Sequence, residues 1–294
     1  SGSRDTTVRV WGVADARPSE WGEARKLEGH RYSVRSVAWS PDSRWLLSAS
    51  GDMTVCVWGV NGTDPSAWKE VRRLEGHEEV VVAVAWSLDS RWIASGAKDK
   101  TVRLWAADGG DPGAWREVRR LEVPKSFVWS VVLSRGAEWL VGGSVDKTVH
   151  VWAGEGGDAR SWDELADLAG HEGVIESVAW SLDSKWIASA SQDKTVRVWA
   201  ANGTDPGAWR EVRRLGHEDR IWLAAWSPDS RWIVSASGGT GRERSSVHVW
   251  GVADEDPSAW GTEVRTLAGH EGVVWAVAWS PNSRWILSCG EDKT

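Results

Sequence analysis

The chain repeats one unit of 47 residues, and this repetition constrains the fold more than any other feature. Tryptophans mark the period: Trp11, Trp58, Trp105, Trp152 and Trp199 follow one another at intervals of 47 residues, and Trp250 follows after 51. A unit of this length cannot bury its apolar faces alone, so successive copies must pack against each other. The sequence therefore predicts six similar units that share their cores.

Each unit carries the pattern of four short strands. In one copy the strand signals, which alternate along the chain or are rich in β-branched residues, lie at 33–40, 45–50, 54–58 and 69–74. The first two are separated by Ser40-Pro41-Asp42-Ser43-Arg44, which is typical of a tight turn, and the next two by Gly51-Asp52. Four antiparallel strands form a twisted sheet whose faces need cover from neighbouring sheets.

A Gly-His pair, a later Asp and a strand-ending Trp recur together, and this combination resembles the WD-repeat β-propeller family. The matching residues are Gly29-His30, Asp52 and Trp58; Gly76-His77, Asp99 and Trp105; Gly170-His171, Asp193 and Trp199; Gly216-His217 and Trp250; and Gly269-His270 and Asp292. One feature differs, since Gly or Ala always follows the Trp and Asp never does. The resemblance implies an all-β, six-bladed propeller in which each blade is a four-stranded antiparallel sheet.

We expect one propeller domain over 1–294. Its blades are predicted at about 24–70, 71–117, 118–164, 165–211, 212–262, and 263–294 closed with 1–23. The chain starts within a unit and stops at the complementary place, so the last segment supplies two strands and the first segment two more. Such closure removes exposed sheet edges. Residues 1–7 overlap in pattern with 288–294, which is also what a fragment of a longer tandem array shows.

The composition limits the partners. A net charge of −7 and an isoelectric point near 5.6 argue against nucleic acid and anionic membranes. No apolar run approaches the length of a bilayer span. Cys56 and Cys289 lack the spacing of a metal site and are interpreted as small buried side chains. We expect an intracellular, cytoplasmic, monomeric ring without metal or cofactor.

A His, a Ser and an Asp recur in each complete unit, which are the residue types of a hydrolase triad. A catalytic set is needed once, whereas this set is repeated with a Trp after it, so we interpret it as a structural network. Its expected members are His30, Ser48, Asp52 and Trp58; His77, Ser95, Asp99 and Trp105; His171, Ser189, Asp193 and Trp199; and His270, Ser288, Asp292 and Trp11. By resemblance to the family, Asp accepts from the Gly-His turn, His bonds the hydroxyl and the hydroxyl bonds the indole. Ser50 is an alternative to Ser48.

Two units depart from this pattern. In the third, Val123-Pro124 replaces Gly-His and Gly142 replaces the serine; in the fifth, Asp is absent and the insertion 238–246 lengthens a loop. The insertion offers Arg242 and Arg244 for contact with a partner, although drift in a redundant array is equally plausible. His150 and His248, at equivalent third-strand positions, are expected to be packed or solvated, since they lie in different blades.

The connections after the third strands end in Trp21, Trp68, Trp115, Trp162, Trp209 and Trp260. Because all six units have this residue, we expect it to cover the seam between blades. Acidic residues of these loops, such as Asp64, Asp111 and Asp205, have poor spacing for calcium and belong to Asp-Pro turns.

The binding face is predicted from one position of the first strand, which varies most among the six units. We call the six residues at this position the column. By resemblance, this position lines the channel on the Gly-His side, near the residue two before it and the one preceding the network Asp. The column consists of Arg35, Val82, Trp129, Glu176, Trp222 and Trp275, and Phe127, the only phenylalanine, precedes Trp129 by two. Aromatic residues with a charged rim are typical of interface hot spots, although they could also simply fill the channel.

These observations favour a non-catalytic scaffold that binds a protein or peptide segment on the Gly-His face. Trp222 and Trp275 are the expected anchors, and Arg35 and Glu176 are expected to set orientation. Two alternatives stay open. The chain could be a propeller segment of a larger repeat or sensor protein, or an enzyme or ligand-binding propeller that uses its channel. An enzyme would need a pocket that holds titratable residues found in one blade only.

Overall fold

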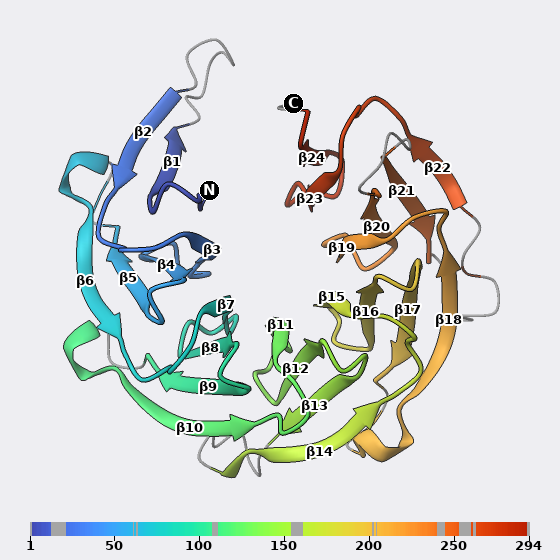
Figure 1. Cartoon of the computed structure of the whole chain (residues 1–294), viewed down its shortest axis with the longest axis horizontal. Helices are drawn as coiled ribbons and strands as arrows, with labels where there is room; N and C mark the ends of the chain where they lie inside the picture. The colour runs from blue at the N-terminus through green and yellow to red at the C-terminus, as the bar shows by residue number, and fades with distance from the viewer. Residues whose placement is uncertain are drawn as a thin grey trace. The chain divides into compact units, whose positions relative to one another are not determined.

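The computed structural model describes residues 2–12, 22–60, 62, 64–107, 111–153, 161–201, 203, 205–239, 245–252, 260 and 263–292. The regular elements that these ranges contain in full are strands and the 3₁₀ turns η2 (Pro65–Ala67), η3 (Pro112–Ala114) and η6 (Pro206–Ala208). Figure 1 shows the strands in groups along the chain, and each group forms one antiparallel sheet. No helix in this described part has the length and apolarity that a membrane crossing requires.

The chain divides into two compact units. The first comprises Ser1–Ala137 with Asp158–Arg160, and the second comprises Glu138–Gly157 with Ser161–Thr294. The prediction that 1–294 forms a single domain stays a prediction, and each unit is described by itself.

Five sheets contain four strands and two contain two strands in the described residues. In chain order the strands are β1 (Val8–Gly12) and β2 (Gly22–Leu27); β3 (Val34–Trp39), β4 (Trp45–Ser50), β5 (Val55–Gly59) and β6 (Lys69–Leu74); β7 (Val81–Trp86), β8 (Trp92–Ala97), β9 (Thr101–Ala106) and β10 (Arg116–Glu122); β11 (Val128–Leu133), β12 (Trp139–Ser144), β13 (Val149–Ala153) and β14 (Asp163–Leu168). The remaining strands are β15 (Ile175–Trp180), β16 (Trp186–Ser191), β17 (Thr195–Ala200) and β18 (Arg210–Gly216); β19 (Ile221–Trp226), β20 (Trp232–Ser237), β21 (Ser246–Gly251) and β22 (Glu263–Leu267); and β23 (Val274–Trp279) and β24 (Ile286–Gly290).

The turns form as their residues predict. Between β3 and β4, Ser40 Oγ donates to Asp42 Oδ1 at 2.5 Å, and the Ser43 amide donates to the Ser40 carbonyl at 2.9 Å. Ser43 has a φ of 58°, the left-handed conformation that closes the reversal. The acidic loop residues that could have suggested calcium instead start the 3₁₀ turns, because Asp64 Oδ1 accepts from the Ser66 amide at 2.9 Å.

The cores lie between successive sheets. In the first unit β4 is buried along its whole length, and Leu47 and Val57 share a cluster with Val81 and Ile93 of the next sheet. In the second unit Ala188 and Val198 likewise share a cluster with residues of β19 and β20. Burial on both faces removes the simple alternation of a half-exposed strand and makes each sheet depend on its neighbours.

Tryptophans of the long connections complete these cores. The rings of Trp45 and Trp86 lie 5.4 and 5.6 Å from the ring of Trp115, between two neighbouring sheets of the first unit. In the second unit Trp139 and Trp180 surround Trp209 in the same way, at 5.1 and 5.8 Å. The expectation that these tryptophans cover the seams is confirmed for both, whereas Trp21 lies outside the described residues.

The first and last sheets have two strands each, β1–β2 and β23–β24. Their union into one closed sixth blade stays a prediction. Trp285 and Leu287 of the last segment are largely exposed. The interpretation of both cysteines as buried is wrong for Cys289, which is exposed, and right for Cys56.

Candidate functional site

The two predicted anchor residues form a tryptophan pair in the second unit. Trp222 on β19 and Trp275 on β23 lie with their ring centroids 5.0 Å apart and their planes tilted by 56°. The Trp222 indole N–H donates to the Gly238 carbonyl at 2.9 Å, which fixes that ring. Trp275 keeps 49% of its surface exposed. We call these two residues the tryptophan pair.

Glu176 occupies the same column on β15. Its carboxylate accepts a hydrogen bond of 2.5 Å from Gln192 Nε2, and Gln192 directly precedes the network residue Asp193. Burial raises the pKa of Glu176, although the Gln192 bond and the charge of Arg220 favour its ionised form. The predicted column and the residue preceding the network Asp therefore do come together on this sheet.

A second aromatic group lies in the first unit. The rings of Phe127 and Trp129 lie 5.3 Å apart, edge to face, and Lys98 Nζ lies 5.6 Å from the centroid of each. A cation of the chain itself thus occupies the position over these rings, at a distance typical of cation–π contact. This group is consequently less available to a partner than the tryptophan pair.

The other residues of the prediction lie in the first unit or outside the described residues. Arg35 on β3 is exposed in the first unit, and Val82 of the same column is buried on β7. Arg242 and Arg244 lie outside the described residues.

The predicted polar networks are present as hydrogen bonds. In the sheet of β3 to β6, His30 Nδ1 lies 2.7 Å from Asp52 Oδ2 and Nε2 lies 2.7 Å from Ser48 Oγ. The Trp58 indole donates to the same Ser48 oxygen at 2.8 Å. The structure thus gives the bond to Ser48, whereas the Ser50 hydroxyl donates to the Tyr32 carbonyl.

The same bonds recur in two further sheets and in part of a third. The equivalent sets are His77, Ser95, Asp99 and Trp105; His171, Ser189, Asp193 and Trp199; and His270, Ser288 and Asp292. Trp11 lies in the other unit from Ser288, with its side chain exposed, and its place in the fourth network stays a prediction.

Burial sets the electrostatics of these networks. Burial opposes ionisation of Asp193 most strongly, but hydrogen bonds from Thr195, the Glu172 amide and His171 together lower its pKa to about 2. Burial also lowers the pKa of His171, and Asp193 only partly offsets this effect. Ser189 is completely buried and accepts the Trp199 N–H, so its hydroxyl is out of reach of any substrate. The geometry of a triad is therefore used for structure.

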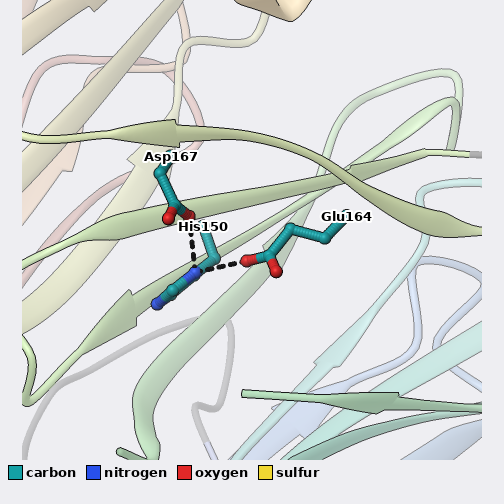
Figure 2. A group of neighbouring side chains, drawn as sticks. All are labelled: His150, Glu164 and Asp167. Atoms are coloured by element: carbon teal, nitrogen blue, oxygen red, sulfur yellow. Dashed lines mark hydrogen bonds and ion pairs between the residues drawn. The ribbon is translucent and has the colours of Figure 1, made fainter. Parts of the chain in front are cut away.

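The third sheet contains a group that the sequence interpretation missed. His150 on β13 points with Nδ1 at two carboxylates of β14, Glu164 and Asp167, as Figure 2 shows. Sequence reasoning compared His150 with the residues at the equivalent third-strand position of the other units and did not consider the neighbouring strand. A signal was available, because most other units have a basic residue at the positions of His150 and Asp167.

The fifth sheet has lost the Asp of its network. His217 Nε2 still lies 3.0 Å from Ser235 Oγ, but the His217 ring now packs against His248 at 4.4 Å. Within the described residues His217 Nδ1 has no partner. Burial and the nearby His248 lower the pKa of His217 to about 3.

The fold and the repeated networks define a β-propeller repeat protein. The model of the family "WD domain, G-beta repeat" matches residues 21–59, 68–106, 115–153, 162–200, 209–250 and 261–294. The chain therefore belongs to the WD-repeat family, and its six repeats are those of an all-β six-bladed propeller.

Curated relatives match only short stretches. A probable cytosolic iron-sulfur protein assembly protein, Ciao1, from Anopheles gambiae is 55% identical over 31 residues, 10% of this chain and 9% of the relative. The probable homologue from Nematostella vectensis, CIAO1, is 61% identical over 28 residues, again 10% of this chain and 9% of the relative. The matched stretch spans about a tenth of either relative, which is less than the length of one repeat.

Proposed function

We propose that the chain is a non-catalytic scaffold that binds an apolar segment of another protein at the tryptophan pair. Membership of the WD-repeat family supports a role in protein interaction. The observation that carries the proposal is the half-exposed indole of Trp275, held 5.0 Å from a Trp222 that is itself fixed by a hydrogen bond. Rigid aromatic side chains lose little conformational freedom on binding and are enriched at interface hot spots.

The residues around the pair indicate the kind of segment. Glu176 lies in the same column, and its burial and bond to Gln192 hold it in one orientation. We propose that it pairs with a donor of the partner, while the tryptophan pair accepts an apolar or aromatic side chain. Arg35, in the other unit, stays a predicted contact.

The relatives bear only on the cellular location that we propose. Their names place them in the cytosol and in protein assembly, and we propose a cytoplasmic location for this chain on that basis. The buried serines of the networks support the absence of hydrolytic chemistry at those positions, and we propose that the chain is not an enzyme.

The test first needs a partner, which affinity capture from the native host and mass spectrometry can supply. The double variant Trp222→Ala/Trp275→Ala is then compared with the parent for partner affinity and melting temperature. We expect at least a tenfold loss of affinity, about 1.4 kcal/mol, with a preserved melt. The matched control is Trp285→Ala, since Trp285 is also exposed but lies outside the column.

Two results would contradict the proposal. If affinity stays at the level of the parent and of Trp285→Ala, the partner binds elsewhere. If the double variant melts early, the single variant Trp275→Ala is measured instead, because its half-exposed ring contributes less to packing, and an unchanged affinity in this variant contradicts the proposal. Capture of only a longer protein that contains this chain would favour the alternative of a repeat segment within a larger array.

A further inference from the structure

The group around His150 stands out in the second unit because its charges do not balance. His150 Nδ1 lies 2.5 Å from Glu164 Oε1 and 2.8 Å from Asp167 Oδ1, and Nε2 lies 3.2 Å from Asp146 Oδ2. Three carboxylates therefore surround one imidazole. Within the described residues no Lys or Arg pairs with these carboxylates, so even a protonated imidazole would balance only one of their three charges. A surplus of this kind calls for a cation or for protons.

The fourth sheet shows what normally occupies this place. There Arg197 and Arg214 stand opposite each other on neighbouring strands, and both bond Glu211, at 2.6 and 3.1 Å. Arg197 also lies 3.7 Å from Asp193, the counterpart of Asp146. Two guanidinium groups thus balance two carboxylates.

In the third sheet both cations are replaced, one by His150 and one by Asp167, which face each other in the same register. The position equivalent to the network histidine is Pro124, which offers no side-chain donor, so Asp146 turns to His150 instead. The third sheet thus lacks the guanidinium groups that the fourth sheet has here. It keeps the two carboxylates, Asp146 and Glu164, and adds a third, Asp167. This exchange makes the place suited to an external cation.

The ring of His150 is held in place by burial and by stacking. It is buried, with 5% of its side chain exposed, and it stacks on Trp152 with centroids 5.6 Å apart and an angle of 22° between the planes. Glu164 and Asp167 retain 35% and 46% exposure, so solvent reaches the group from their side. An ion can therefore approach from solvent and bind between the two carboxylates and the buried imidazole ring.

We propose that His150 Nδ1, Glu164 and Asp167 bind a divalent cation of the zinc class, with Asp146 accepting the Nε2–H of His150. Imidazole nitrogen and carboxylate oxygen are zinc ligands at about 2.0 to 2.2 Å, which sets the ligand atoms about 3.3 Å apart. The present separations of 2.5 and 2.8 Å require the carboxylates to move by less than about 1 Å. A carboxylate on the second nitrogen is the usual support of a histidine ligand.

The ligand chemistry also selects against other ions. One nitrogen with carboxylate oxygens and an open side suits zinc or another first-row metal, whereas calcium takes six to eight oxygens. Solvent completes the coordination at the exposed side. The site lies on β13 and β14, away from the tryptophan pair on β19 and β23, so it does not depend on the proposed binding function.

Isothermal titration of the full chain with zinc chloride, after removal of metal with a chelator, tests the site. We expect one zinc ion per chain in the parent. The double variant His150→Arg/Asp167→Arg recreates the arrangement of the fourth sheet and should lose saturable binding. Asp167→Asn is a milder second variant that keeps the fold. The variant Asp146→Asn should weaken binding about 10- to 100-fold, as removal of a supporting carboxylate does.

The matched control is His248→Arg, which changes a histidine at the equivalent third-strand position of the fifth sheet and should leave zinc binding unchanged. Cobalt in place of zinc adds a visible spectrum that reports nitrogen and oxygen ligation. The proposal is overturned if the parent shows no saturable zinc binding. It is equally overturned if Asp167→Asn and the double variant bind zinc as the parent does, since the ion then lies elsewhere.

Discussion

His150 stands directly opposite Asp167 across β13 and β14, with Nδ1 and Oδ1 2.8 Å apart, where the next sheet sets Arg197 opposite Arg214. The backbone register is the same in both sheets, and only the side chains differ. In a repeat array each position is presented several times, so one copy can change its chemistry while the others keep the shared packing. The repeated networks keep the shared packing, and the His150 group is a copy whose chemistry has changed.

The first prediction concerns the stability of the His171 network. His171→Ala removes the bonds of the imidazole to the buried Asp193 and Ser189, which are 2.7 Å each in the parent. We expect the free energy of unfolding to fall by about 1 to 3 kcal/mol. Chemical denaturation measures it, with Glu172→Ala as a control on the neighbouring exposed residue. An unchanged free energy in His171→Ala would mean that the network does not stabilise the sheet.

The second prediction is a loss of stability in acid that depends on Asp193. Its pKa is lowered to about 2 in the folded chain, below the value of about 3.8 for the unfolded chain. The contribution to stability is therefore complete above pH 4 and is lost as the pH falls toward 2, with a size on the order of 2 kcal/mol. Asp193→Asn should flatten this part of the stability curve. A parent and a variant with equal slopes between pH 4 and 2 would contradict the lowered pKa.

The third prediction is a loss of stability between pH 6.5 and 3 that depends on His217. Burial and His248 lower the pKa of His217 to about 3, so the folded chain resists a proton that the unfolded chain takes up near pH 6.5. The unfolded state then binds more protons between these values, and stability falls as the pH falls from 6.5 toward 3. His217→Gln cannot be protonated and should lose this part of the slope.

The comparison needs a control because His171 also has a lowered pKa. The difference between the parent and His217→Gln isolates the contribution of His217, and His248→Gln removes the neighbouring ring that helps to lower the pKa of His217. If His217→Gln keeps the full slope between pH 6.5 and 3, His217 is already protonated in the folded chain or is exposed.

The sequence predicted the repeated framework well. The predicted ranges 45–50 and 69–74 coincide with β4 and β6, because the turns that bound strands are determined by local residues. The period located the network residues because each unit must satisfy the same buried bonds. The exposure of Cys289 was not predictable in this way, since exposure depends on what packs over a strand.

The His150 group was missed for a reason of geometry. In a regular strand, residues three apart lie on opposite faces, so Glu164 and Asp167 do not look like ligands of one ion. The β13–β14 pairing has a bulge at Val151/Trp152, opposite the segment between these two residues. The bulge brings both carboxylates to the face of His150. Bulges leave little trace in a sequence, although the loss of two basic residues in one copy was visible.

The last prediction concerns the two cysteines. Cys56 is completely buried, and burial raises the pKa of its thiol, so it is protonated and shielded. Cys289 lies exposed on the two-stranded sheet of β23 and β24. A thiol reagent should therefore modify one thiol per folded chain and a second only after unfolding, because reaction needs an accessible thiolate. The rapid phase should disappear in Cys289→Ser and persist in Cys56→Ser. A Cys289 that reacts as slowly as Cys56 would contradict its exposure, and is the result expected if β1 and β2 complete this sheet as the sixth blade.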